Sequence, residues 1–184
     1  MLIKFLTCSL VIISLSATGW SAGDRVNKIR LTPLQQVFIL KQLNPQIRKI
    51  GILCDLSKRG DLPERLARIS AQLQVKIIIK DTPELKNVLK NFRYLVNVQG
   101  AEVVWIFPDP ALTHPSARRY LIKEAVSSRV MLIAPDSEMV QKGATLFAEK
   151  SADQIKVHVN SKAMQLLGLD ITPQLTSTAV VLVK

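Results

Sequence analysis

The sequence predicts an α/β fold with a doubly wound, mostly parallel sheet. Short runs that are apolar throughout, such as "AEVVWIF" at residues 101–107, are typical of parallel strands buried on both faces. Amphipathic stretches with helical spacing separate these runs, which favours alternating strands and helices. The chain has 184 residues, 48% of them hydrophobic and 21% charged, and this composition fits one folded domain.

In the first half of the chain, four elements follow an opening helix. That helix starts at Thr32-Pro33, since proline at the first helical position loses no hydrogen bond, and Asn44-Pro45 stops it. Its apolar face consists of Leu34, Val37, Phe38, Leu40 and Leu43. The next expected elements are a strand at 49–55, a helix at 62–74, a strand at 75–79 and a helix at 84–98.

The second half continues the alternation. The strand at 101–107 is followed by a helix at 116–128, a strand at 130–134, a short helical turn at 136–143 and a further strand at 144–148. His158 alternates with apolar residues and is expected to face one side of a strand. The closing segment "STAVVLVK" is a strand that pairs either within this sheet or across a dimer.

Residues 1–23 have the layout of a secretory signal peptide. Lys4 precedes an apolar run at 5–15, and small residues follow, with cleavage expected after Gly19 or Gly23. The run is short for a membrane span, which needs about 20 residues, and an uncleaved anchor is the alternative. Cleavage leaves residues 24–184 as a single α/β lobe in an exported protein.

The charge of the chain limits the kinds of partner that it is expected to bind, and its cysteine content limits the disulfides that it can form. The formal net charge is +11, with basic residues scattered along the chain rather than in a block. This pattern is explained by a basic surface that is exposed to solvent. The alternative is that the basic residues bind an anionic ligand or an anionic membrane face. Nucleic acid is not an expected partner. Cys54 is the only cysteine after the signal, so no internal disulfide is expected, and Cys54 is predicted to be a buried strand residue.

Polar residues and prolines follow the predicted strands at the edge where open α/β sheets bind ligands. The candidate ligand-binding residues are Asp55, Ser57, Asp81, Asp109, Thr113 and Pro135. The alternative is that each of them only caps a helix or shapes a turn.

Motifs for catalysis and metal binding are missing from the sequence. It has no glycine-rich phosphate loop and no G-x-S-x-G motif. His114 and His158 are the only histidines, and neither has the spacing of metal ligands. We therefore expect no enzymatic activity, no cofactor and no metal.

Three stretches in the right order resemble a known family. Residues 108–144 combine Pro108-Asp109 after a strand, a helix, "RVMLIA" and a turn from Val140 to Gly143-Ala144. Residues 34–53 and 156–175 agree with the lead-in and closing motifs of the same family. Together they resemble the second lobe of ABC transporter substrate-binding proteins, of the periplasmic binding protein type 1 group, over nearly all of 32–175.

This resemblance implies a single Rossmann-like lobe in the periplasm that binds a small organic solute at the carboxyl ends of its strands. The first lobe of the family is not expected here, and the segment before 156 is shortened. Implied partners are the solute and a membrane component of an ABC transporter or sensor, and a homodimer would rebuild a two-sided cleft. The alternative is a degenerate lobe that acts as a periplasmic interaction or sensory module. For the solute binder, Asp109→Ala is expected to abolish stabilisation by solute and leave the fold intact.

Overall fold

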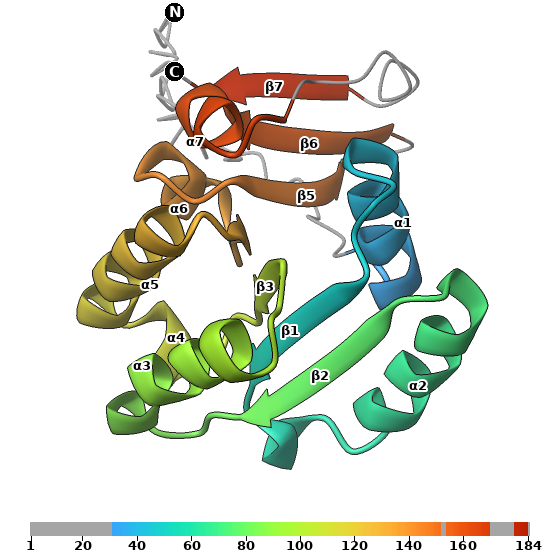
Figure 1. Ribbon diagram of the computed structural model, residues 1–184, viewed down its shortest axis with the longest axis vertical. Coiled ribbons are helices and arrows are strands. Elements are labelled where there is room, and N and C mark those ends of the chain that lie inside the picture. Colours follow the sequence, from blue (N-terminus) through green and yellow to red (C-terminus); the bar gives the residue numbers. More distant parts are fainter. Residues whose placement is uncertain (1–30, 152–153, 170–178, 184) are drawn as a thin grey trace, which may run out of the picture.

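The computed structural model describes residues 31–151, 154–169 and 179–183, and these form one seven-stranded sheet with helices on both faces (Figure 1). The predicted α/β fold is thus confirmed. The predicted signal peptide at 1–23 lies outside the described residues. No helix in the described ranges is both long enough and apolar enough to cross a membrane.

Strands and helices alternate as the sequence predicts, except that the strands at 146–151 and 154–160 follow one another directly. The elements in chain order are α1 (Pro33–Leu43), β1 (Lys49–Cys54), the 3₁₀ turn η1 (Leu56–Lys58), α2 (Leu62–Leu73), β2 (Lys76–Asp81), α3 (Leu85–Arg93), the π-helical turn η2 (Tyr94–Val98), β3 (Val103–Ile106), α4 (Pro110–Thr113), α5 (Pro115–Ser128), β4 (Met131–Ile133), α6 (Ser137–Gln141), β5 (Leu146–Ser151), β6 (Gln154–Asn160), α7 (Ser161–Leu166) and β7 (Ala179–Val183).

Strand order in the sheet is β2-β1-β3-β4-β5-β6-β7. Strands β1 to β5 are parallel to one another, β6 runs antiparallel to β5, and β7 is parallel to β6. Ile50 of β1 pairs with Ile77 of β2 on one side and with Val103 of β3 on the other. The closing strand therefore joins this sheet, which is one of the two predicted arrangements.

Two hydrophobic layers cover the two faces of the sheet, because successive strand residues point to opposite sides. Ile52 of β1 faces α1 and α2, and its neighbour Leu53 faces α3 and α5. Phe92 of α3 and Leu121 of α5 are fully buried in the second layer. The sheet is thus a central layer between two sets of helices, which leaves the ends of its strands as the accessible edge.

The helix ends follow local rules. Thr32 caps α1 in a reciprocal capping box, in which Gln35 N donates to Thr32 Oγ1 at 3.3 Å and Thr32 N donates to Gln35 Oε1 at 2.9 Å.

The predicted helix at 84–98 is α-helical only as far as Arg93, and it continues as a π turn. In that turn Leu95 packs on Gly51, where a Cβ atom would lie 3.0 Å from Leu95 Cδ1. This close approach explains the glycine in β1.

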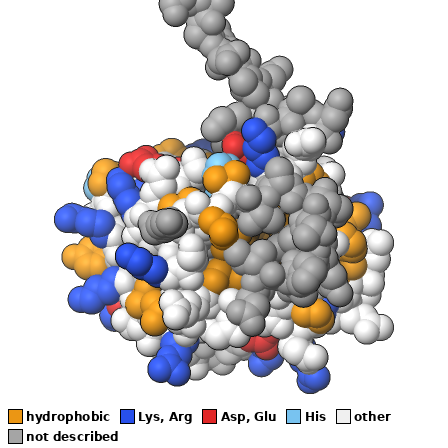
Figure 2. Space-filling model, turned by 90° about the horizontal axis from the view of Figure 1, so that it is seen from above, with side chains coloured by type: hydrophobic (Ala, Val, Ile, Leu, Met, Phe, Trp, Pro, Cys, Tyr) orange, Lys and Arg blue, Asp and Glu red, His pale blue; other side chains and the backbone are white. Residues whose placement is uncertain are grey.

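The two edges of the sheet differ in character. β2 carries Lys76 and Lys80, charges that discourage edge-to-edge pairing. At the other end, Leu166 on α7 and Leu182 on β7 expose about three-fifths of their surface, at 60% and 57%. Figure 2 looks onto this end and shows hydrophobic side chains near the centre of the face, with Lys and Arg around its rim.

Cys54 is fully buried at the end of β1, and burial raises the pKa of its thiol to about 12. Because the thiolate is the reactive form, we expect the native protein to resist thiol reagents at pH 8. The rate of modification by a chromogenic disulfide should rise with urea in step with unfolding. Stoichiometric labelling of the native protein within minutes would contradict this expectation.

Candidate functional site

Asp109 joins the ends of β1 and β3. Its Oδ2 accepts a hydrogen bond from Asp55 N at 2.8 Å, and its Oδ1 lies 2.8 Å from Arg59 Nη2. Arg59 Nη1 also donates to the carbonyl oxygen of Asp55 at 3.3 Å. Asp109 is only 2% exposed, so both of its oxygens are used inside the protein. This carboxylate fixes the shape of the corner.

The neighbouring aspartates are used in a similar way. Asp55 Oδ1 accepts from Ser57 N at 3.1 Å and from Ser57 Oγ at 2.5 Å, and Lys58 Nζ lies 2.9 Å from Asp55 Oδ2. The bond from Ser57, followed by Lys58, lowers the pKa of Asp55. Asp81 Oδ1 accepts from Leu56 N at 2.9 Å. The predicted strand-end residues thus meet at one edge, where these carboxylates bind backbone N–H groups as caps and turn residues do.

A cavity of about 320 Å³ lies beyond the carboxyl ends of β3 and β4, and we call it the strand-end cavity. Its aromatic wall consists of Trp105, Phe107 and Phe147. The rings of Trp105 and Phe107 are 4.7 Å apart at their centroids. Pro108 and Pro135 add rigid apolar surface. Such a mostly apolar hollow with a few polar groups is typical of small-molecule sites.

The lining of the strand-end cavity includes four polar residues: Gln36, Asp136, Ser137 and Glu149. Asp136 is held by the guanidinium of Arg118, whose Nη1 donates to Asp136 Oδ1 at 2.9 Å. Glu149 Oε1 lies 3.1 Å from His158 Nε2 on the neighbouring strand. These contacts help to fix the positions of the Asp136 and Glu149 side chains.

Of the residues predicted from the sequence, Pro135 lines the strand-end cavity. Four others, Asp55, Ser57, Asp81 and Asp109, belong to the adjacent corner and do not line it. Sequence reasoning missed the aromatic wall and Gln36. Trp105 and Phe107 occupy alternate positions at the end of β3, and this spacing puts two rings on one face of the strand. This alternation of two aromatic residues is the sequence signal that could have predicted the aromatic wall.

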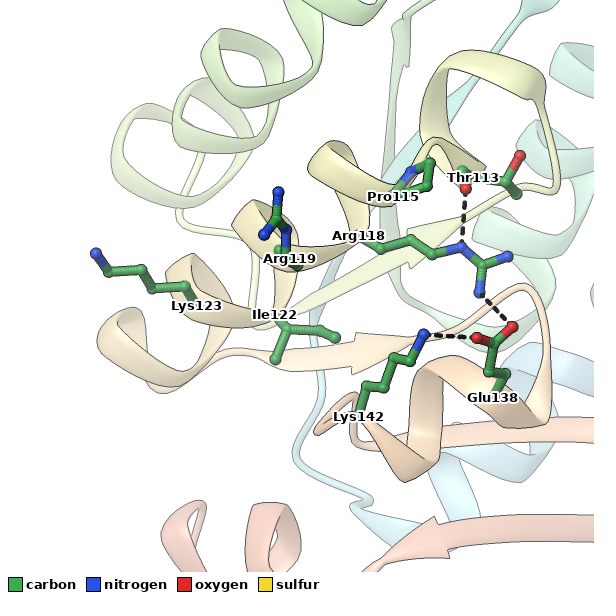
Figure 3. Close-up of a pocket in the computed structure, with 8 residues that line it drawn as sticks. All are labelled: Thr113, Pro115, Arg118, Arg119, Ile122, Lys123, Glu138 and Lys142. Atoms are coloured by element: carbon green, nitrogen blue, oxygen red, sulfur yellow. Dashed lines mark hydrogen bonds and ion pairs between the residues drawn. The ribbon is translucent and has the colours of Figure 1, made fainter.

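The sixth predicted residue, Thr113, lines a separate groove of about 520 Å³ on the outer side of α5 and α6 (Figure 3). Arg118 reaches across this groove to the carbonyl oxygen of Thr113 at 2.9 Å and to Glu138 at 3.7 Å. Lys142 pairs with the same Glu138 at 2.5 Å. The groove is larger than the strand-end cavity, but these charges already bind one another and it lies away from the sheet.

No protein-family model and no curated protein sequence matches the chain. Solved structures do match. One is a conserved domain protein from Vibrio cholerae, with a TM-score of 0.68 and 17% identity over 83% of this chain and 61% of that one. Another is an ABC domain from Streptococcus pneumoniae in complex with L-Trp, with a TM-score of 0.65 and 17% identity over 81% of this chain and 62% of that one.

A third match is a substrate-binding protein with adhesive properties from Clostridium difficile, in a ligand-free, open state. The TM-score is 0.64 and the identity 16%, over 84% of this chain and 61% of that one. The chain thus spans about three-fifths of the length of these proteins. At this identity the likeness concerns the fold alone, and the chain shares its α/β fold with these three proteins, one of which is a substrate-binding protein.

Proposed function

We propose that the chain is an exported, non-enzymatic solute-binding lobe that holds a small organic solute in the strand-end cavity. The observation that carries this proposal is the aromatic wall at the carboxyl ends of β3 and β4. Ligands of open α/β sheets bind at this edge. The neighbour in complex with L-Trp supports the view that this fold suits small organic ligands.

The geometry favours a solute with a flat apolar part. Trp105 and Phe107 offer ring surface, and the fixed backbone of Pro108 and Pro135 holds the opposing rim in place. The cavity is open on one side, so a solute bound by this lobe alone is only partly covered and is held less tightly than an enclosed one. We propose that a second copy of the chain or a membrane component of an ABC transporter covers that side.

Residues 1–23 are proposed to act as the signal peptide that delivers the lobe to the periplasm. Release of the solute to a membrane transporter would then complete uptake.

The test is a thermal-shift screen of the exported product against amino acids, nucleosides, small aromatics and organic ions. A ligand at about 100 times its dissociation constant adds about 2.7 kcal/mol, which moves the midpoint by several degrees. Ser137→Tyr places a large side chain at the lining of the cavity and should abolish the shift, whereas Ser127→Tyr on the exposed surface of α5 should preserve it. An equal shift in both variants would place the solute elsewhere.

A second candidate function is a periplasmic interaction module, and the groove between α5 and α6 favours it. Arg119 and Lys123 are exposed beside this groove, and within the described ranges no acidic side chain forms a salt bridge with them. Figure 3 shows both side chains directed away from the Arg118–Glu138 contact. They suit an acidic segment of a membrane partner. A folded protein that no solute stabilises, and whose membrane partner is lost on Arg119→Glu with Lys123→Glu, would favour this function over solute binding.

A further inference from the structure

A small apolar furrow lies between α3 and α5, which pack side by side on one face of the sheet (Figure 1). We call it the α3–α5 furrow. Val88 and Ala117 are buried at its base, whereas Leu85 and Tyr120 expose 41% and 54% of their surface. Leu89 and Ser116 complete the lining residues that the structure describes. The furrow therefore has a buried apolar base and two exposed sides.

The α3–α5 furrow has the size of a side chain. Its volume is about 150 Å³, whereas sites for small molecules usually measure about 300–1,000 Å³. A leucine or phenylalanine side chain of a partner suits such a hollow, and apolar side chains that fill pockets are typical anchors of protein interfaces. The exposed Tyr120 agrees with this interpretation, because tyrosine is enriched among the residues that contribute most to binding.

Basic residues border the furrow on both helices. Lys90 follows Leu89 on α3, and Arg119 precedes Tyr120 on α5, with Lys123 one turn further along α5. All three basic side chains are exposed, and none of them forms a salt bridge within the part of the chain that the structure describes. Their charges are thus available to a partner.

The acidic residues on the same two helix segments are paired with other bases. Glu84 Oε2 lies 2.7 Å from Lys86 Nζ, and Glu124 accepts hydrogen bonds from Arg93 at 3.0 and 2.8 Å. The surface around the furrow is therefore positive, and it complements an acidic segment. A second copy of this chain fits less well, because its formal net charge of +11 would bring further positive charge to this surface.

We propose that the α3–α5 furrow binds an acidic segment of another protein through one large apolar side chain. That side chain enters between Leu85 and Tyr120, and acidic residues on either side of it lie near Lys90, Arg119 and Lys123. The proposal rests on the interaction-module function, which it deepens, and it does not depend on solute binding in the strand-end cavity. The apolar surface is recessed, which favours a protruding side chain over an anionic membrane, into which apolar groups of the protein would have to insert.

The test uses three fluorescein-labelled peptides that differ in their central residue or in their charge: EEDSFSDEE, EEDSGSDEE and KKRSFSRKK. Binding to the exported product is measured by fluorescence anisotropy at pH 7 and low ionic strength, where attraction between charges is least screened. We expect EEDSFSDEE to bind at least about fivefold more tightly than EEDSGSDEE, because only the first peptide buries an apolar ring. It should bind at least about tenfold more tightly than KKRSFSRKK, which carries the wrong charge.

The two tyrosines of the chain provide a matched pair of variants for the apolar contact. Tyr120→Ala should remove the preference for the peptide with phenylalanine over the one with glycine. Tyr94→Ala, in η2 and outside the furrow lining, should keep that preference. A thermal melt of each variant shows that it is folded.

A second pair of variants tests the charges. Arg119→Gln combined with Lys123→Gln should weaken the binding of both acidic peptides several-fold. Lys76→Gln combined with Lys162→Gln removes two exposed lysines from β2 and α7 and should have a smaller effect. Equal weakening by the two double variants would mean that the overall charge of the protein, and not this surface, attracts the peptides.

The outcomes separate the furrow from the functions proposed above. Equal binding of EEDSFSDEE and EEDSGSDEE, or an unchanged preference in Tyr120→Ala, overturns the furrow as the anchor site and leaves the groove between α5 and α6 as a site for acidic segments. Sedimentation with vesicles of phosphatidylcholine and phosphatidylglycerol tests the membrane. Vesicle binding that Tyr120→Ala abolishes, without peptide binding, would assign this surface to lipid and overturn the proposal. If no peptide binds, the proposal fails, while the solute screen decides solute binding by itself.

Discussion

Replacing Asp109 with alanine is expected to destabilise the protein by about 3 kcal/mol, the lower end of what breaking a buried ion pair costs. Arg59 would lose the carboxylate at 2.8 Å while 17% of its side chain is exposed, and the backbone N–H of Asp55 would lose its acceptor. Urea unfolding followed by circular dichroism would measure the change in the free energy of unfolding.

Two further variants make the Asp109 result interpretable. Asp109→Asn keeps a side-chain oxygen for the backbone of Asp55 and should cost less than the alanine variant. Asp81→Ala removes an exposed carboxylate of the same corner and should cost about 1 kcal/mol or less. The sequence alone predicts a different result for Asp109→Ala, an intact fold that no longer responds to solute. If Asp109→Ala melts like the unchanged protein and loses its solute response, Asp109 binds solute and does not hold the corner together.

Trp105→Ala is expected to have the second large effect. Trp105 is 7% exposed, packs in the layer that faces α1 and α2, and forms part of the cavity wall. Truncating a buried aromatic side chain costs about 3–5 kcal/mol. Solute stabilisation should disappear as well, because the ring beside Phe107 is lost. Both quantities come from unfolding curves recorded with and without solute.

The Trp105→Phe variant separates the effect of Trp105 on stability from its effect on solute binding. A smaller ring should recover much of the lost stability and keep a measurable response to solute. A response to solute that survives unchanged in Trp105→Ala would move the binding site away from the strand-end cavity.

Most of the fold could be predicted from the sequence because its local signals agree with its packing. Thr32-Pro33 starts α1 as predicted, and the run at 101–107 contains β3, whose four residues are all buried. Several features escaped prediction, among them the short helical segments η1, α4 and α7. The helix continues after Arg93 as a π turn, in which Leu95 packs on Gly51, a residue far away in sequence. The reversal of β6 depends on pairing with β5, which the apolar pattern does not encode.

The site was harder to predict because it combines residues from separate elements. The rule that ligands bind beyond the carboxyl ends of strands led to Pro135, which lines the strand-end cavity. The same rule could not distinguish Asp109, whose carboxylate oxygens bind groups of the protein itself, from residues that line a cavity. Gln36 comes from a helix that precedes the whole sheet, and it reaches the cavity only because α1 packs against β5 through Ala148. That long-range contact has no signature in local sequence.

The placement of the strand-end cavity has a consequence for how this protein can evolve. Pro108, Pro135, Asp136 and Ser137 follow the strands instead of forming them, whereas the strands themselves supply most of the buried core. Selection can therefore alter the rim without dismantling the sheet. Proteins that share this architecture at 16–17% identity can therefore differ in what they recognise while they keep the same scaffold.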